Sequence, residues 1–427
     1  MKSTGGKYER SIYRLGSWRA RGAGYLLSAL CLCAGHRDAV AQPLSVTHIG
    51  SIFVEGNTKT GADLILDASE LRSGMPIEAS TLGEARQRIL NKRVFSDVQV
   101  EAITNGGIVD LRIVVKERLT LLPVPFVSSS DGQRRGGVFL LDTNLFGRMK
   151  TLAAGITLST LGRSVVGLYH DPSLFSSRWA TRVNTLYSDL IQQRRAGPEV
   201  VYAFQESRDE LAAALGYKLT RALSLYGGAF YVHVNATAND AYVRPANPGD
   251  VAGLSAEIDL RAANYHSYFD EGLVLNAQYR RGLLGRDAAQ SRFKVQLTTR
   301  TFDDQSVSLI LQYLGATGDP NIDAHRLGGK TGTRGFAPFG LWAEHAATAT
   351  VEYQVPITHF KFGTWTLNGF CDTGHVVWRA EALDFVTPGL GTRFYLKSVA
   401  FPAVGLDVSY STHDDRIVTS GSIGMSF

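Results

Sequence analysis

The chain has 427 residues, with 44 Lys and Arg, 39 Asp and Glu, and three cysteines. This length allows a small domain plus a large one, and no stretch reaches the roughly 18 consecutive apolar residues of a transmembrane helix. Residues 1–41 carry the whole net charge of +5, so the remaining chain is near neutral and its bulk charge gives no support to a nucleic-acid partner.

The first 41 residues have the pattern of a secretory signal peptide. A basic segment comes first, an apolar segment follows over 23–35, and residues 39–41 (Ala-Val-Ala) have the form of a cleavage site. We expect cleavage after residue 41, with an uncleaved anchor as the alternative. Because Cys31 and Cys33 lie in this segment, Cys371 alone would remain, and the exported chain would have no internal disulfide.

Residues 44–118 have the pattern of a small α+β domain. A β-rich segment at 45–54 is followed by two helical patterns, at 60–71 and 81–90. Two strands with apolar residues at every second position then flank a turn at 105–107. The predicted order is therefore β-α-α-β-β.

Two helix starts can be proposed from the residues in this domain. Thr60 is expected to cap the first helix with its hydroxyl group. Thr81 and Glu84 have the spacing of a capping box, in which each side chain bonds a free backbone N–H of the first turn. The second helix is therefore expected to begin at Thr81.

From residue 136 to residue 427 the pattern is that of strands alone. Apolar and polar residues alternate, as in 292–300 and 306–313, without a helical segment. A soluble sandwich has the same alternation, but the export signal and the length of the run favour a membrane barrel. About 290 residues at roughly 18 per strand and connection predict about 16 antiparallel strands in a closed barrel. Residues 119–135 are expected to be a linker.

Several short motifs resemble those of the outer-membrane assembly and two-partner secretion superfamily, also called the bacterial surface antigen family. In the first domain they are Val54-x-Gly56-Asn57, Gly74, Val94-Phe95 and Val115-x-Glu117. In the second they are Asp142-Thr-Asn144-Leu-Phe-Gly147, Asp171-Pro172, Thr333-Arg334-Gly335-Phe336, Phe370-Cys-Asp372-Thr-Gly374, Gly389-Leu-Gly391 and the terminal Phe427. The resemblance implies a periplasmic POTRA domain at 44–118 and an outer-membrane barrel at 136–427, with Phe427 as the C-terminal signal by which such barrels are recognised.

The resemblance also implies a role for Arg334. In this family the Arg of the motif lies on a long extracellular loop that folds back into the lumen, where it engages carboxylates of the inner wall. The residues that would do so here are Arg334 and Asp372, with Glu352 as a second candidate. Independently, the alternation along their strands places Glu352 and Asp372 on the polar, inward face. The alternative is an exposed Arg in a glycine-rich loop.

For function, the resemblance implies outer-membrane protein insertion or polypeptide translocation. An unfolded or partly folded client polypeptide would dock on a free sheet edge of the POTRA domain and pass to or through the barrel, or leave sideways between its first and last strands. The alternative for the POTRA domain is a plain spacer. The alternatives for the whole chain are a passive channel or surface scaffold, and a dedicated secretion transporter.

The sequence gives no sign of catalysis. It has neither a G-x-S-x-G nucleophile motif nor the spacing of an H-E-x-x-H metal site. We therefore expect no enzyme activity, no cofactor, no metal and no nucleic-acid partner. The expected partners are outer-membrane lipid and the client polypeptide.

Overall fold

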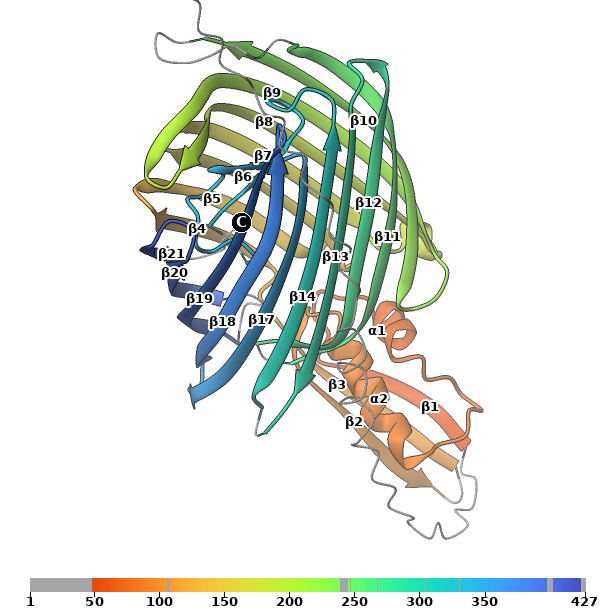
Figure 1. Cartoon of the computed structure of the whole chain (residues 1–427). Coiled ribbons are helices and arrows are strands. Elements are labelled where there is room, and N and C mark those ends of the chain that lie inside the picture. The colour runs from red at the N-terminus through yellow and green to blue at the C-terminus, as the bar shows by residue number, and fades with distance from the viewer. Residues whose placement is uncertain are drawn as a thin grey trace, which may run out of the picture. The chain divides into compact units, whose positions relative to one another are not determined.

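The computed structural model describes residues 48–105, 108–238, 245, 247–266, 268–302, 304–329, 331–397 and 402–423. Residues 47–427 form one structural unit, in which a small sheet with two helices precedes a closed barrel (Figure 1). The predicted signal peptide and the terminal Phe427 lie outside the described residues.

The first domain has the predicted order β-α-α-β-β. Its elements are β1 (His48–Glu55), α1 (Ala62–Ser69), α2 (Ala79–Leu90), β2 (Phe95–Asn105) and β3 (Ile108–Glu117). The sheet order is β1-β3-β2, with β1 parallel and β2 antiparallel to β3. Because β3 is central, β1 and β2 are the two edges of the sheet.

The core of this domain lies between the sheet and the helices. Alternate residues of β3 point into it, with Leu111 and Ile113 fully buried. Ile65 of α1 and Ile89 of α2 meet them from the other side. The period of two in the sequence therefore marks the buried face of a strand. No helix among the described residues is long and apolar enough to cross a membrane.

Both predicted helix caps are wrong in detail. The N-cap of α1 is Gly61, without a side-chain hydrogen bond, so Thr60 lies just before the helix. The helix α2 begins at Ala79, two residues earlier than expected, with Glu78 as its N-cap, and the Thr81 hydroxyl accepts the Glu78 N–H at 3.1 Å. Thr81 thus occupies the third helical position, from which its hydroxyl accepts the free backbone N–H of the N-cap residue.

The described part of the second domain contains a closed barrel of sixteen strands. They are β4 (Leu121–Ser130), β5 (Gln133–Leu145), β6 (Lys150–Ser159), β7 (Gly162–Asp171), β8 (Trp179–Ala196), β9 (Glu199–Lys218), β10 (Leu223–Thr237), β11 (Gly249–Tyr265), β12 (Asp270–Gly285), β13 (Ala289–Arg300), β14 (Ser306–Thr317), β17 (His345–His359), β18 (Gly363–Trp378), β19 (Glu381–Leu396), β20 (Pro402–Ser411) and β21 (Arg416–Ile423). A short 3-10 turn, η1 (Leu174–Ser176), joins β7 to β8. The pairing is antiparallel throughout, and β21 closes the barrel on β4.

The two faces of the barrel wall differ as the alternation predicts. In β17, the inward Thr350 is 1% exposed, whereas its neighbour Val351 is 52% exposed on the outer surface. The same outer surface carries Leu211, Leu254, Leu297 and Leu367, all exposed. The outside of the barrel is therefore apolar, as a lipid-facing wall requires.

The prediction of a linker at 119–135 is wrong. Its residues form β4, the turn at Asp131–Gly132 and the start of β5, so the barrel begins at Leu121. Val124 and Phe126 of β4 are buried, and their neighbours Pro123, Pro125 and Val127 are exposed. Pro123 and Pro125 conceal this alternation in the sequence, because proline argues against a paired strand.

We predict that Leu111→Ala destabilises the first domain by about 2–5 kcal/mol, because it leaves a cavity in a packed core. The measurement is hydrogen–deuterium exchange over residues 48–117 of the full chain, which should become faster. Ile103→Ala is the control, since Ile103 is 45% exposed and its replacement should leave exchange unchanged. Equal exchange in the two variants would contradict this account of the core.

Candidate functional site

The connection between β14 and β17 folds against the inward face of the barrel wall. It contains a small hairpin of β15 (His325–Leu327) and β16 (Leu341–Ala343). We call residues 318–344 the inner loop. Several of its polar residues are buried, including Asn321, Asp323 and Thr333, so its folded position is set by specific contacts with the wall.

The guanidinium of Arg334 lies between two carboxylates of the wall. Its Nε and Nη2 donate to the two oxygens of Asp372, at 2.9 and 2.7 Å, and its Nη1 donates to Glu352 at 2.5 Å. The backbone N–H of Arg334 also donates to Asp372, at 3.1 Å. The structure therefore brings together the three residues that the sequence analysis singled out, in a bidentate arrangement that only an Arg side chain can make.

The seat of this guanidinium is buried, and further contacts surround it. Asp372 is fully buried and accepts a further hydrogen bond from the Thr350 hydroxyl at 2.8 Å. The Arg334 guanidinium carbon lies 3.3 Å from the centre of the Phe370 ring, a cation–π contact. The Ser409 hydroxyl donates to the Arg334 carbonyl at 3.1 Å. Strands β17, β18 and β20 therefore all hold the loop at this residue.

The rest of the motif fills the space beside Arg334. Phe336 is buried and packs edge-on against Phe385 of β19, with ring centres 4.9 Å apart. A Cβ atom on Gly335 would lie 2.6 Å from the hydroxyl of Thr387. The motif therefore needs a residue without a side chain between an anchoring Arg and an anchoring Phe.

Three motif glycines of the wall make room for aromatic and polar side chains. A Cβ on Gly389 would lie 2.3 Å from the Phe370 ring, and a Cβ on Gly374 would lie 2.8 Å from the Phe385 ring. A Cβ on Gly391 would lie 2.1 Å from a carboxylate oxygen of Asp407. These glycines thus allow the rings beneath and beside the loop motif to lie flat against the wall.

A second anchor of the inner loop was missed by the sequence analysis. Trp342 of β16 is 1% exposed and packs against Tyr202 of β9 and Trp378 of β18, with ring centres 5.4 and 5.6 Å away. Its indole N–H donates to the Gln193 carbonyl at 3.1 Å, and the Trp378 N–H donates to the Pro320 carbonyl at 2.8 Å. The only signal in the sequence was the presence of rare tryptophans in otherwise unremarkable positions.

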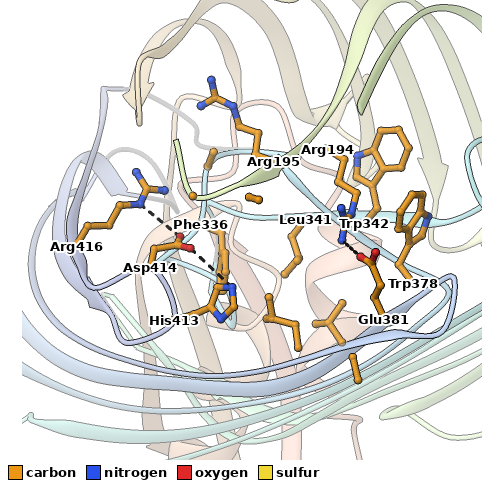
Figure 2. A pocket seen from close by; sticks show the side chains of 17 residues that line it. Arg194, Arg195, Phe336, Leu341, Trp342, Trp378, Glu381, His413, Asp414 and Arg416 are labelled. Carbon is orange, nitrogen blue, oxygen red and sulfur yellow. Dashed lines mark hydrogen bonds and ion pairs between the residues drawn. The ribbon is translucent and has the colours of Figure 1, made fainter. Parts of the chain in front are cut away.

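A cavity of about 220 Å³ remains between the two anchors (Figure 2). Phe336 and Trp342 line it from the loop, and Trp378 lines it from the wall. Its charged side chains have opposite charges beside them: Arg194 bonds Glu381, and Arg416 lies 3.4 Å from Asp414 and 2.5 Å from Asp131. The cavity is therefore space left where the loop meets the wall, with its charges already paired.

The motif at the start of the barrel bonds the first domain. The Asn144 amide donates to the Thr60 hydroxyl at 2.8 Å, and Lys59 Nζ lies 3.1 Å from the buried carboxylate of Asp142. Gly147 has a φ of 70°, and a Cβ there would lie 1.9 Å from the Lys59 carbonyl oxygen. Asp142, Asn144 and Gly147 therefore contact the first domain at the junction of the two domains. They take no part in holding the inner loop at Arg334.

Asp171 and Pro172 end strand β7. The Asp171 carboxylate is 1% exposed, lies 2.9 Å from Lys150 Nζ and accepts the Ser173 N–H at 3.0 Å. This arrangement ends the strand with a turn that proline can begin. It is a structural role, separate from the site at Arg334.

Glu117 is the last residue of β3, the final strand of the first domain. Its carboxylate accepts the Thr58 hydroxyl at 2.7 Å and the backbone N–H groups of Lys59 and Thr60 at 3.0 and 2.7 Å. Partial burial pushes the pKa of Glu117 up, but these hydrogen bonds stabilise the carboxylate more, and its pKa lies below the ordinary value. Among the described residues, no cluster of His, Cys, Asp and Glu has the arrangement of a metal site.

A domain with this β-α-α-β-β order, followed by a closed barrel of sixteen strands with a loop held inside it, defines the class of the protein. Residues 47–118 match the POTRA family, described as a surface antigen variable number repeat. No curated protein matches the sequence. The family match covers only the first domain, so the class of the barrel is set by its fold.

Most of the chain is similar in fold to three solved structures. For BamA from Haemophilus ducreyi lacking POTRA domains 1–3, the TM-score is 0.53 at 15% identity, over 89% of this chain and 85% of that one. For CdiB from Acinetobacter baumannii, the TM-score is 0.58 at 17% identity, over 90% of this chain and 74% of that one. For CdiB from Escherichia coli, the TM-score is 0.54 at 10% identity, over 92% of this chain and 93% of that one.

The predicted resemblance is thereby confirmed at the level of domain family and fold. The chain combines a POTRA domain with the barrel fold of BamA and CdiB. The barrel with its apolar outer surface, joined to a POTRA domain, points to the bacterial outer membrane.

We predict that Arg334→Ala releases the inner loop while the barrel stays folded. Removing one partner of a buried ion pair costs about 3 kcal/mol or more, which corresponds to roughly a hundredfold rise in loop opening. Limited proteolysis of residues 318–344 should accelerate accordingly. Arg334→Lys should give an intermediate rate, because one ammonium cannot bond both oxygens of Asp372.

The control for this prediction is Arg300→Ala. Arg300 is the last residue of β13 and its side chain is 47% exposed, so the variant should be cleaved as the parent is. Unchanged proteolysis of Arg334→Ala would mean that the ion pair does not hold the loop.

We predict that acid weakens the first domain through Glu117. Because its pKa is lowered in the folded state, its stabilising contribution is present above the unfolded pKa and is lost as the pH falls through the folded value. The melting temperature should therefore fall less between about pH 6 and about pH 3 in Glu117→Gln than in the parent. Parallel curves for the two proteins would contradict this.

Proposed function

We propose that this protein is a non-enzymatic device for moving polypeptides into or across the bacterial outer membrane. The POTRA domain lies in the periplasm and receives an unfolded or partly folded client. The barrel then inserts the client into the membrane or translocates it. Transport uses the free energy of client binding and folding, without a cofactor.

The observation that carries this proposal is the ion-paired inner loop. A buried Arg334–Asp372 pair at 2.7 Å holds this loop against the inner wall, an arrangement that a passive channel does not need. Buried ion pairs contribute little net stability compared with apolar packing, but they specify one position over others. In the proposed mechanism, breaking this pair releases the loop from that position and opens a path for a client.

The edge strand β2 supports client docking. Backbone bonding alternates along the ladder with β3, and we infer from the terminal pair Asn105–Ile108 that the N–H and C=O groups of Val98, Val100, Ala102 and Thr104 point outward. The Val98 carbonyl accepts Arg86 Nε at 2.7 Å. Further along β2, no described residue bonds these outward groups, so the stretch from Val100 can add an extended client strand.

The first experiment is quantitative proteomics of the outer membrane and culture medium, with and without this gene. Loss of many barrel proteins would identify a general insertase, and loss of one or two would identify a dedicated transporter with its client. No change in any protein would overturn the proposal in favour of a scaffold. Complementation with Arg334→Ala should restore less of any lost protein than the parent gene does, because its loop is no longer held.

We further predict that Ala102→Pro abolishes client docking while the POTRA domain stays folded. The substitution removes an outward N–H and leaves the pairing with β3 intact, since proline is tolerated on a free edge. Ala102→Val is the matched control, because it keeps the N–H. The measurement is the same proteomic comparison, and full activity of Ala102→Pro would place client docking elsewhere.

A further inference from the structure

The inward face of β13 is open beside its contact with the inner loop. Because Leu297 faces outward, the even-numbered residues of β13 face the lumen. Gln290 donates its side-chain amide to the Asp323 carbonyl of the loop at 2.8 Å. The next two inward residues, Arg292 and Lys294, are both exposed. Exposed inward side chains border free space in the lumen, so the loop does not cover this part of the wall.

These two residues lie on the side of the inner loop from which a client would approach. Strand β4 is the first strand after the POTRA domain, and neighbouring strands of the barrel are antiparallel. Strand β13 therefore runs toward the end of the barrel at which the POTRA domain is attached. Lys294 is nearer to that end than Arg292, and both are nearer to it than Gln290. A chain that enters from the periplasm would meet them before it met the loop.

Two other basic side chains of the inner wall near β13 already have carboxylate partners. Arg182 of β8 pairs with Glu257 and Asp259 of β11, with a distance of 2.5 Å to Asp259. Arg280 of β12 lies 2.5 Å from Glu210 of β9. The wall from β8 to β12 therefore neutralises these two charges with its own acidic residues.

Arg292 and Lys294 differ from these side chains in their surroundings. Among the described residues, neither side chain takes part in a hydrogen bond or an ion pair. Strands β12 and β14 flank β13 (Figure 1). The four residues opposite the pair on these strands have no carboxylate; they are Gln278, Leu314, Asn276 and Gln312. Two positive charges therefore face the lumen without a partner from the neighbouring strands, and such a surface raises the local concentration of anions.

We propose that Arg292 and Lys294 form a binding site for two carboxylates on one side of an extended client segment. The two residues alternate along a strand, so their Cα atoms lie about 6.6 Å apart. Two Asp or Glu side chains separated by one residue have the same spacing and face the same side in an extended chain. The guanidinium can bond one carboxylate through two N–H groups, and the ammonium provides the second charge.

This inference rests on the proposed function and deepens it. It assigns to the client an extended segment in which two acidic residues flank one other residue. The amide side chains beside the pair, among them Asn276 and Gln312, are neutral hydrogen-bonding groups that suit a polypeptide. The segment would bind on the periplasmic side of the inner loop, before the loop is released.

The test follows the modification of a thiol placed beside the site. Gln296 is the next inward residue of β13 and is partly exposed. Gln296→Cys, in a Cys371→Ser background, is modified with N-ethylmaleimide, an uncharged reagent. The full chain is used in detergent, and its folding is judged by heat-dependent migration in SDS gels. The probe is a peptide of Ser and Thr that carries two Asp residues separated by one residue.

This peptide should slow the modification of the thiol. Arg292→Gln and Lys294→Gln together should raise the peptide concentration for half protection at least about tenfold, because the charge-assisted hydrogen bonds are lost. Arg292→Lys with Lys294→Arg keeps both charges and should be protected nearly as the parent is. If the double Gln variant does not fold, Lys294→Gln alone serves the same comparison.

A second peptide provides the matched control for spacing. It has the same composition and charge, but its two Asp residues are adjacent and face opposite sides of an extended chain. It should protect at least several-fold more weakly than the first peptide. A peptide with Lys in place of both Asp residues should give no protection.

The outcomes that would overturn the inference are distinct. No protection by the first peptide, or equal protection in the double Gln variant, would overturn the site. Equal protection by the two Asp peptides, or by inorganic phosphate at the same concentration, would overturn its assignment to an extended client segment. None of these results bears on whether the protein moves clients, because the assay contains no client. A proteomic comparison without any change would overturn the proposed function and leave the peptide result intact.

Discussion

A closed sheet in lipid must bond every backbone N–H and C=O within itself, since the bilayer core offers no alternative partner. Fifteen of the sixteen strand junctions of this barrel join strands that a turn or the inner loop connects in sequence, and one, between β21 and β4, joins the two ends of the barrel. Among the described residues, that junction pairs Ser420–Ile423 with Val127–Ser130. The position of every inward side chain, including those that hold the inner loop, follows from this closure.

The inner loop shows how a polar motif is used inside such a barrel. Arg334 is 2% exposed, and its charge is matched by one fully buried carboxylate and one that is 20% exposed. A buried ion pair of this kind is costly to form and costly to break. The loop therefore has one well-defined position. A second anchor of the loop, Trp342, is held by aromatic contacts instead.

The sequence predicted the faces of strands well and their partners poorly. Parity along a strand decides which side a residue faces, so Glu352 and Asp372 could be placed on the inner wall, and the family motif supplied Arg334 as their partner. Thr350, Ser409 and Trp342 complete the same site, but their proximity depends on register across strands far apart in the chain. The expected linker failed for a local reason: Pro123 and Pro125 argue against a paired strand, although both lie within β4.

The described tryptophans fall into two groups that differ in solvent exposure. Trp179 and Trp365 are 45% and 44% exposed on the outer surface of the barrel, whereas Trp342 and Trp378 are 1% and 6% exposed between the inner loop and the wall. Arg326 stacks 4.0 Å above the Trp342 ring, and Arg194 stacks 4.4 Å above that of Trp378. Fluorescence quenchers carried on lipid tails would therefore reach the first pair, while emission from the second pair would change with displacement of the loop. The chain thus contains its own spectroscopic reporters of the bilayer and of the lumen.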